Sequence, residues 1–263
     1  MITFETIENG NSWTGVEWNI EDEDELAKLL ARVAMGQYRH VLKVLEGTNC
    51  IEYAPTKSII DGAIQLLTAK NPDEPWHRDG WLFQVISWFA ANIQNPQTLK
   101  SAPHMIHAHK GFDGVHIILD KNNENVAAVV ICEEKATGNP RNKITSQVWP
   151  EFISLETGSR DNELVSEITA LLEKNGHIDP DEAVHKIFWE KARAYRVSIT
   201  VGDKENSEKG RKALFKGYET AAPGKNVEKR RAEIFYQKNI REWMSDISAK
   251  AIAAAEQLDL KDV

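Results

Sequence analysis

One stretch decides the fold of this chain: KGFDGVHIILDKNNENVAAVVICEEK, residues 110–135. Two runs rich in β-branched residues, 115–119 and 126–131, flank a turn rich in Asn and Asp at 120–125. This order predicts a β-hairpin. Because a hairpin returns the chain to its starting end, residues just before the first strand and just after the second are expected to lie close together.

Charged residues occupy both of those positions. Asp113 precedes the first strand. Glu133 lies at the end of the second strand, 20 positions after Asp113. Strand alternation puts Glu133 and Lys135 on one face and Glu134 on the other. Such charges are costly at the end of a buried strand unless they are paired or bind a metal. The alternative is that the strand reaches solvent at Glu133 and its charges are ordinary surface residues.

Carboxylate oxygens are the ligands that Mg²⁺ and Mn²⁺ prefer, with water and substrate phosphate filling the remaining positions. A divalent metal held by Asp113 and Glu133 would lower the pKa of a bound water. The hairpin end therefore predicts a site suited to phosphodiester hydrolysis.

These residues resemble the PD-(D/E)xK nuclease superfamily, with Asp113 as the first acid and Glu133-Glu134-Lys135 as the (D/E)xK motif. The resemblance implies a central mixed α/β sheet flanked by helices and metal-dependent DNA cleavage. It implies Mg²⁺ or Mn²⁺ bound by Asp113, Glu133 and the backbone carbonyl of Glu134. Lys135 would orient the attacking water or stabilise the transition state. Gln147 lies where related nucleases often place a polar residue near the scissile phosphate.

Nucleases of this type place a helix ahead of the hairpin, and that helix often carries a Glu. The helix expected here over 77–93 is apolar around much of its circumference, which is typical of a helix buried against a sheet. It offers Asp79 and Gln84, so the acidic position is either shifted or replaced by an amide. The number of metal ions stays open for this reason.

A longer motif, HxxHxHKGFDGVHI at 104–117, together with the strand ending in Glu-Glu-Lys, resembles the HamA family, the nuclease subunits of Hachiman antiphage systems. The resemblance covers mainly residues 76–152. It implies DNA as substrate and a helicase partner of the HamB type that senses DNA damage and restrains the nuclease. The alternative, from a different class, is a non-catalytic nucleic-acid-binding or scaffold subunit on a decayed nuclease fold. The intact Asp113, Glu133 and Lys135 set favours the nuclease, and the missing helix Glu leaves room for the alternative.

Four histidines, His104, His107, His109 and His116, cluster around the first strand of the hairpin. Zinc is one interpretation, although no Cys partners them and no His-Glu-x-x-His is present. His107 and His109 are expected to share a strand face. Packing or phosphate contacts are the simpler interpretation of such a pair.

The net charge of −8 is unevenly distributed. Residues 1–75 hold 6 Lys and Arg against 13 Asp and Glu, whereas residues 186–250 hold 16 against 9. This asymmetry predicts a basic surface for phosphates and an acidic one that faces elsewhere, for example a partner. Solvated helices that happen to carry lysines are the alternative.

DNA contacts are expected from basic residues that lie near aromatic ones, because the basic side chains can contact phosphates while the aromatic rings stack on bases. The candidates are Lys110, Lys212, Lys229, Arg230 and Arg231. A solvated lysine-rich loop is the alternative. The chain has no P-loop, so any ATP-driven work would belong to another protein.

Composition and length predict a soluble protein. The 263 residues contain no apolar run long enough to span a bilayer, and the N-terminus lacks a signal-peptide pattern. The two cysteines, Cys50 and Cys132, do not make a disulfide framework, so a reduced cytoplasmic protein is expected.

The break at 71–75, which contains two prolines, is the expected domain boundary. An N-terminal strand and helical region over 1–75 would dock a partner. The nuclease core over 76–263 would end in a helical part. Within that core, helices are expected at 162–174, 181–194 and 227–258, and a strand at 195–201.

Overall fold

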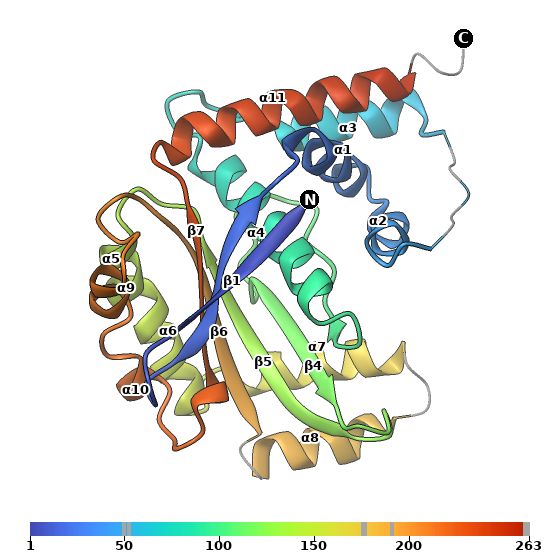
Figure 1. Cartoon of the computed structure of the whole chain (residues 1–263). Coiled ribbons are helices and arrows are strands. Elements are labelled where there is room, and N and C mark those ends of the chain that lie inside the picture. Colours follow the sequence, from blue (N-terminus) through green and yellow to red (C-terminus); the bar gives the residue numbers. More distant parts are fainter. Residues whose placement is uncertain (49–50, 52–53, 175–177, 190–191, 260–263) are drawn as a thin grey trace.

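The computed structural model describes residues 1–48, 51, 54–174, 178–189 and 192–259. These residues form a seven-stranded mixed sheet in the order β1-β2-β7-β6-β5-β4-β3 (Figure 1). The strands are β1 (Ile2–Glu8), β2 (Thr14–Ile20), β3 (Leu99–Lys100), β4 (Gly114–Leu119), β5 (Val126–Lys135), β6 (Arg193–Val201) and β7 (Arg230–Tyr236). The sheet confirms the mixed α/β fold class.

Parallel pairing defines the middle of the sheet, where β2, β7, β6 and β5 lie side by side in parallel. Antiparallel hairpins close both edges: β1 pairs with β2, and β4 pairs with β5 and β3. The predicted hairpin is therefore confirmed. Strands β5, β6 and β7 are buried along most of their length, and their apolar residues are accompanied by buried charged residues such as Glu134, Arg196 and Glu233.

Helices cover both faces of the sheet (Figure 1). One face packs on α1 (Glu23–Ala34), α2 (Tyr38–Leu45), α3 (Lys57–Leu67), α4 (Trp76–Gln94) and α11 (Ile240–Asp259). The other packs on α5 (Pro140–Lys143), a π-helical turn (Ile144–Val148), α6 (Trp149–Glu156), α7 (Asp161–Glu173), α8 (Pro180–Trp189), α9 (Glu208–Leu214) and α10 (Tyr218–Ala221). Each face has its own hydrophobic cluster, so the sheet separates two cores.

The start and end of α1 illustrate how the sequence sets these elements. The Asp22 side chain accepts a hydrogen bond from the Glu25 N–H and caps the helix, and acidic residues fill the first turn. Gly36 ends it with a φ of 77°, in the left-handed region that glycine adopts freely.

The helix expected ahead of the hairpin is α4, and it is buried against β5. From Trp81 to Ala91 most of its side chains are buried, whichever way they point around the axis. A helix of this kind has little freedom to rotate, so its polar side chains are held at fixed positions behind the hairpin.

The single long helix expected over 227–258 is wrong in its first part. Residues Val227–Lys229 form a short 3₁₀ turn, Arg230–Tyr236 form β7 in the middle of the sheet, and α11 begins only at Ile240. Ala232 and Ile234 alternate with charged residues as a strand requires, but Arg230 and Glu233 are themselves buried through pairing. Because charged residues are expected at the surface, the sequence did not indicate a buried strand here.

Two further expectations change in detail. Helix α8 ends at Trp189, and Ala194 belongs to β6. Residues 101–113 contain no strand, so His107 and His109 do not share a strand face.

Residues on both sides of the expected boundary at 75 contribute to the same sheet and the same core. Strand β2 pairs with β7, and α1 packs against α11. In the part of the chain that the structure describes, no helix is long and apolar enough to cross a membrane. Cys132 is buried with a free thiol, and Cys50 lies outside the described residues.

Candidate active site

The hairpin brings its predicted charged residues together. Gly114 pairs with Cys132, so Asp113 lies beside the end of β5. The Lys135 ammonium lies 2.7 Å from Asp113 Oδ2 and 2.7 Å from Glu133 Oε2, and thus bridges both carboxylates. The alternative interpretation, in which these charges are ordinary surface residues, does not fit three side chains that contact one another and are each at least two-thirds buried.

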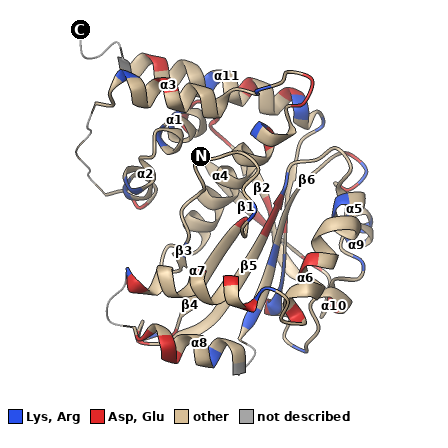
Figure 2. Cartoon of the chain, turned by 180° about the vertical axis from the view of Figure 1, so that it is seen from behind, with Lys and Arg blue, Asp and Glu red and all other residues tan. Residues whose placement is uncertain are grey.

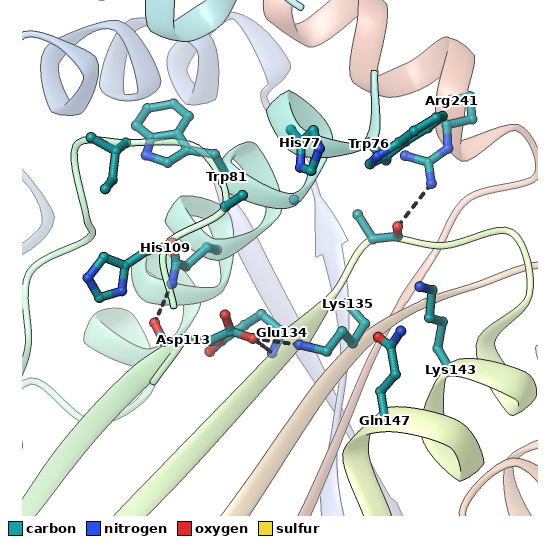
Figure 3. A pocket seen from close by; sticks show the side chains of 15 residues that line it. Trp76, His77, Trp81, His109, Asp113, Glu134, Lys135, Lys143, Gln147 and Arg241 are labelled. Carbon is teal, nitrogen blue, oxygen red and sulfur yellow. Dashed lines mark hydrogen bonds and ion pairs between the residues drawn. The ribbon is translucent and has the colours of Figure 1, made fainter. Parts of the chain in front are cut away.

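Asp113 is held in place from two further directions (Figure 3). Its Oδ2 accepts a hydrogen bond of 2.9 Å from the Glu134 N–H, and its backbone carbonyl accepts one of 2.6 Å from Gln84 Nε2 on α4. One residue of β5 and one of α4 therefore fix the carboxylate at the end of the hairpin.

Burial shapes the electrostatics of this triad. Burial raises the pKa of Glu133 to about 7, although Lys135 opposes the shift. Burial lowers the pKa of Lys135, but the neighbouring carboxylates of Asp113 and Glu133 outweigh this and raise it above its ordinary value. Lys135 is consequently a permanent cation at neutral pH.

Glu134 faces the opposite side of the sheet, toward α4. Its Oε1 accepts hydrogen bonds from Ser87 (3.0 Å) and from Arg196 (3.2 Å), and Arg196 also pairs with Glu233 at 2.5 Å. Its Oε2 is buried without a hydrogen-bond partner. Burial raises the pKa of Glu134 to about 8. The charge of Asp113 adds to this shift, and Glu134 lines the same cavity as Asp113.

A cavity of about 540 Å³ opens above Asp113 and Lys135 (Figure 3). Its other polar lining includes Lys143, Gln147 and Arg241. Gln147, which the sequence predicts near the scissile phosphate, lines this cavity together with Lys143. Gln147 stands in the π-helical turn, a rare geometry that is frequent at functional sites.

The opposite wall is the loop before β4. The rings of His104 and His109 stack with centroids 3.5 Å apart, and His109 Nδ1 accepts a hydrogen bond from the Gly111 N–H. A Cβ on Gly111 would lie 2.5 Å from the His109 ring, so only glycine allows this contact. His116 is buried on β4, 3.5 Å from the Cys132 thiol. His104 and His109 therefore lie together in the loop that forms this wall, whereas His116 is buried apart from them on β4.

Asp79 and Gln84, the two candidate residues on α4, have different positions relative to the cavity. Gln84 lines the cavity and supports Asp113, whereas the Asp79 carboxylate is fully buried between Arg78 and Arg241. Arg241 also donates a hydrogen bond of 3.1 Å to the Ala136 carbonyl (Figure 3). Asp79 thereby connects α4 to the start of α11 and the end of β5, and contributes to the site through Arg241.

The predicted DNA-contact residues do not form one patch with the cavity, and Figure 2 shows basic residues dispersed over α5, α9, α11 and the strands. Lys212 pairs with Glu208, and Lys229 pairs with Glu156. Arg230 and Arg231 start β7, and the residue of β7 that aligns with Lys135 at the end of β5 is Ile234. Arg230 is four residues before Ile234 and Arg231 is three, which is about 13 Å and about 10 Å along the strand. Lys110 lies in the loop that forms the cavity wall.

Arg230 is inside the fold rather than on a basic surface. It is 2% exposed and donates hydrogen bonds to four backbone carbonyls. Its guanidinium ties the turn between β1 and β2 to the segment before β7. The basic stretch at 186–250 is therefore partly structural.

Metal binding was tested against the donor set. Among the described residues, no group of three or more His, Cys, Asp or Glu side chains is arranged to hold a metal ion. Asp113 and Glu133 nevertheless converge on one cation, the Lys135 ammonium. Two carboxylates, the Glu134 carbonyl and water fit Mg²⁺, which usually keeps several waters and takes one or two carboxylates from the protein.

Several residues of the site could not be found from the sequence. Lys143 and Arg241 line the cavity, and Ser87 and Arg196 hold Glu134. Lys143 and Gln147 are four positions apart, which would have placed them on one helix face had the helix been recognised. The other three are brought in by long-range packing that leaves no local pattern.

Comparison of the chain with protein-family models, with curated proteins and with solved structures finds no match.

Proposed function

We propose that this chain is a Mg²⁺- or Mn²⁺-dependent DNA nuclease of the PD-(D/E)xK type. The observation that carries the proposal is the Lys135 ammonium, which contacts both Asp113 and Glu133 and, with Asp113, lines a cavity. Two carboxylates that share a lysine ammonium, which stays charged at neutral pH, are the set of groups expected for metal-assisted phosphodiester cleavage.

Each residue has a definite role in the proposed reaction. Asp113, Glu133 and the Glu134 carbonyl would hold the metal, which when bound lowers the pKa of a water and neutralises charge on the phosphate. The raised pKa of Lys135 makes it a poor general base. It serves instead as a fixed positive charge that stabilises the developing negative charge on the phosphate oxygens. Gln84 keeps Asp113 in position.

The walls of the cavity suit a phosphodiester. Lys143 and Gln147 offer an ammonium and an amide from one side, and Arg241 offers a guanidinium from another (Figure 3). A cavity of about 540 Å³ falls within the usual size range of ligand sites and has room for a nucleotide. Cations along the wall would attract the phosphates that flank the cleaved one.

The resemblance to HamA-type subunits adds a setting to this chemistry. We propose that the chain acts in the cytoplasm as the effector of a bacterial antiphage complex, with a helicase of the HamB type as partner. The motif at 104–117 and the strand that ends in Glu133-Glu134-Lys135 support this setting. Co-purification of the chain with such a helicase would test it.

The proposed activity is tested by incubating purified chain with linear and supercoiled DNA in Mg²⁺, in Mn²⁺ and in EDTA, alone and with the helicase partner. We expect cleavage only with metal, and its loss in Asp113→Asn and Glu133→Gln. The control is Lys121→Met in the exposed turn at the far end of the hairpin. Cleavage that survives both substitutions would place the active site elsewhere, and no cleavage under any condition would favour the scaffold alternative.

A further inference from the structure

An exposed tryptophan stands at the mouth of the cavity. Trp76 begins α4 and is 47% exposed, although the chain buries Trp13, Trp18 and Trp81 almost completely. Its ring lines the same cavity as Lys135, and its centroid lies 6.1 Å from that of His77. Exposed apolar side chains that gather at one place, rather than singly, mark interaction sites and ligand-binding grooves.

The facing wall also presents apolar side chains to solvent. Ile106 lines the cavity and is 59% exposed, and the adjacent Met105 is 44% exposed. The loop that carries them is fixed, because Trp81 Nε1 donates to the His104 carbonyl at 2.6 Å and the His107 ring contacts the Leu66 carbonyl at 2.7 Å. The mouth therefore has two apolar sides held at set positions.

Cations border this apolar mouth. Arg241 lies next to Trp76 in Figure 3, and Lys143 points into the cavity below it. An aromatic ring beside basic side chains is the combination with which proteins bind single-stranded nucleic acid, the ring stacking on a base and the cations contacting the backbone. A protein partner could cover the apolar side chains, but the cations that line the same cavity favour nucleic acid as the occupant.

We propose that Trp76 stacks on an unpaired nucleobase next to the phosphate held at Asp113 and Lys135, so that the site takes a single-stranded segment or a frayed end. This inference rests on the proposed nuclease function. In a duplex both faces of a base are covered by its neighbours, so Trp76 can stack only on a base that has left the stack. Ile106 borders the same base from the opposite wall.

The test is a binding measurement without cleavage. Fluorescence anisotropy in EDTA would give the affinity of the full chain for single-stranded DNA of about 12 nucleotides, a common site size for single-strand binders. A series of the same oligonucleotide with one base missing at each position would locate the stacked base. The variants are Trp76→Ala and Trp76→Phe, and the control is Ile153→Ala, an apolar side chain that is 45% exposed on α6 and does not line the cavity.

We expect wild type to bind single-stranded DNA more tightly than duplex and to lose about tenfold in affinity when one particular base is missing. The affinity of Trp76→Ala for the intact strand should be lower than that of wild type by the same factor. Removing the base should then lower the affinity of Trp76→Ala no further. Trp76→Phe should keep most of the preference, and Ile153→Ala should match wild type. A change of fold in Trp76→Ala would appear in its circular dichroism and would not reproduce this base-specific pattern.

Equal sensitivity of wild type and Trp76→Ala to the missing base would overturn the stacking proposal, as would tighter binding of duplex. Loss of helicase binding in Trp76→Ala with unchanged DNA affinity would make the mouth a protein interface and would also overturn it. Base-specific binding without any metal-dependent cleavage would contradict the nuclease function alone. Cleavage of duplex DNA at the same rate by wild type and Trp76→Ala would contradict the stacking proposal alone.

Discussion

Gln84 on α4 donates a hydrogen bond of 2.6 Å to the backbone carbonyl of Asp113. The helix ahead of the hairpin thus supports the first acid through an amide rather than adding a carboxylate. A carboxylate in this place would repel both the carbonyl oxygen and the Asp113 side chain in the absence of metal. The amide is therefore consistent with a site that needs no second acid from the helix.

Replacing Gln84 tests this relationship. Gln84→Met keeps the length of the side chain and removes the donor, so we expect the free energy of unfolding to fall by about 1 kcal/mol, the usual net value of one hydrogen bond. Gln84→Glu should lower the free energy of unfolding further in EDTA, and Mg²⁺ should restore part of that loss. Urea denaturation with and without Mg²⁺ measures both. An unchanged stability in Gln84→Met would mean that the amide does not hold Asp113.

Lys135→Met tests how Asp113 and Glu133 share a cation. Without the ammonium, the buried Glu133 loses its partner, and we expect a loss of about 2–3 kcal/mol in EDTA, at the low end of the cost of breaking a buried ion pair. Mg²⁺ should then raise the thermal midpoint of the variant more than that of wild type, because the carboxylates are free to bind it. Equal shifts in the two proteins would argue against a metal at this pair.

Glu134→Gln tests the buried carboxyl behind the site. Burial raises the pKa of Glu134 from 4.5 to about 8, so the folded chain holds a proton that the unfolded chain releases between these values. Stability from this group is full below pH 4.5 and is lost as the pH rises through about 8. In EDTA, the stability of wild type should fall more steeply between pH 5 and 8 than that of Glu134→Gln. Identical slopes would show that Glu134 is ionised throughout.

Arg230 and Arg231 are neighbours with different expected roles. Arg230→Met should cost at least about 3 kcal/mol, because four buried carbonyls lose a charged donor. The partly exposed Arg231 side chain donates one hydrogen bond within the described part of the chain, to the Glu228 carbonyl, so Arg231→Met should stay within about 1 kcal/mol of wild type. Chemical denaturation of the two variants compares them directly. Similar losses would contradict the structural role assigned to Arg230.

The hairpin and its charged ends could be predicted because their signals are local. Turn residues, β-branched runs and a 20-residue separation fix the pairing of β4 with β5 and place Asp113 beside Glu133. Helix α4 could be predicted for the same reason, since its apolar residues are continuous. In each case neighbouring residues carry the whole pattern.

Other features depend on partners far away in the chain. Strand β7 was not foreseen because Arg230 and Glu233 look like surface residues until their partners, backbone carbonyls near Asn11 and the guanidinium of Arg196, are known. The cavity wall formed by Arg241 likewise depends on its pairing with Asp79. Long-range pairing of buried charges leaves no periodic trace in the sequence.

The most direct test of the central claim is the initial rate of Mg²⁺-dependent cleavage of plasmid DNA by wild type, Lys135→Met and Lys121→Met in one experiment. The account predicts that Lys121→Met cleaves like wild type. It predicts that Lys135→Met loses at least about a hundredfold in rate, as expected when one electrostatic contact to the transition state is removed. Equal rates for wild type and Lys135→Met would contradict the assignment of the Asp113, Glu133 and Lys135 group as the active site.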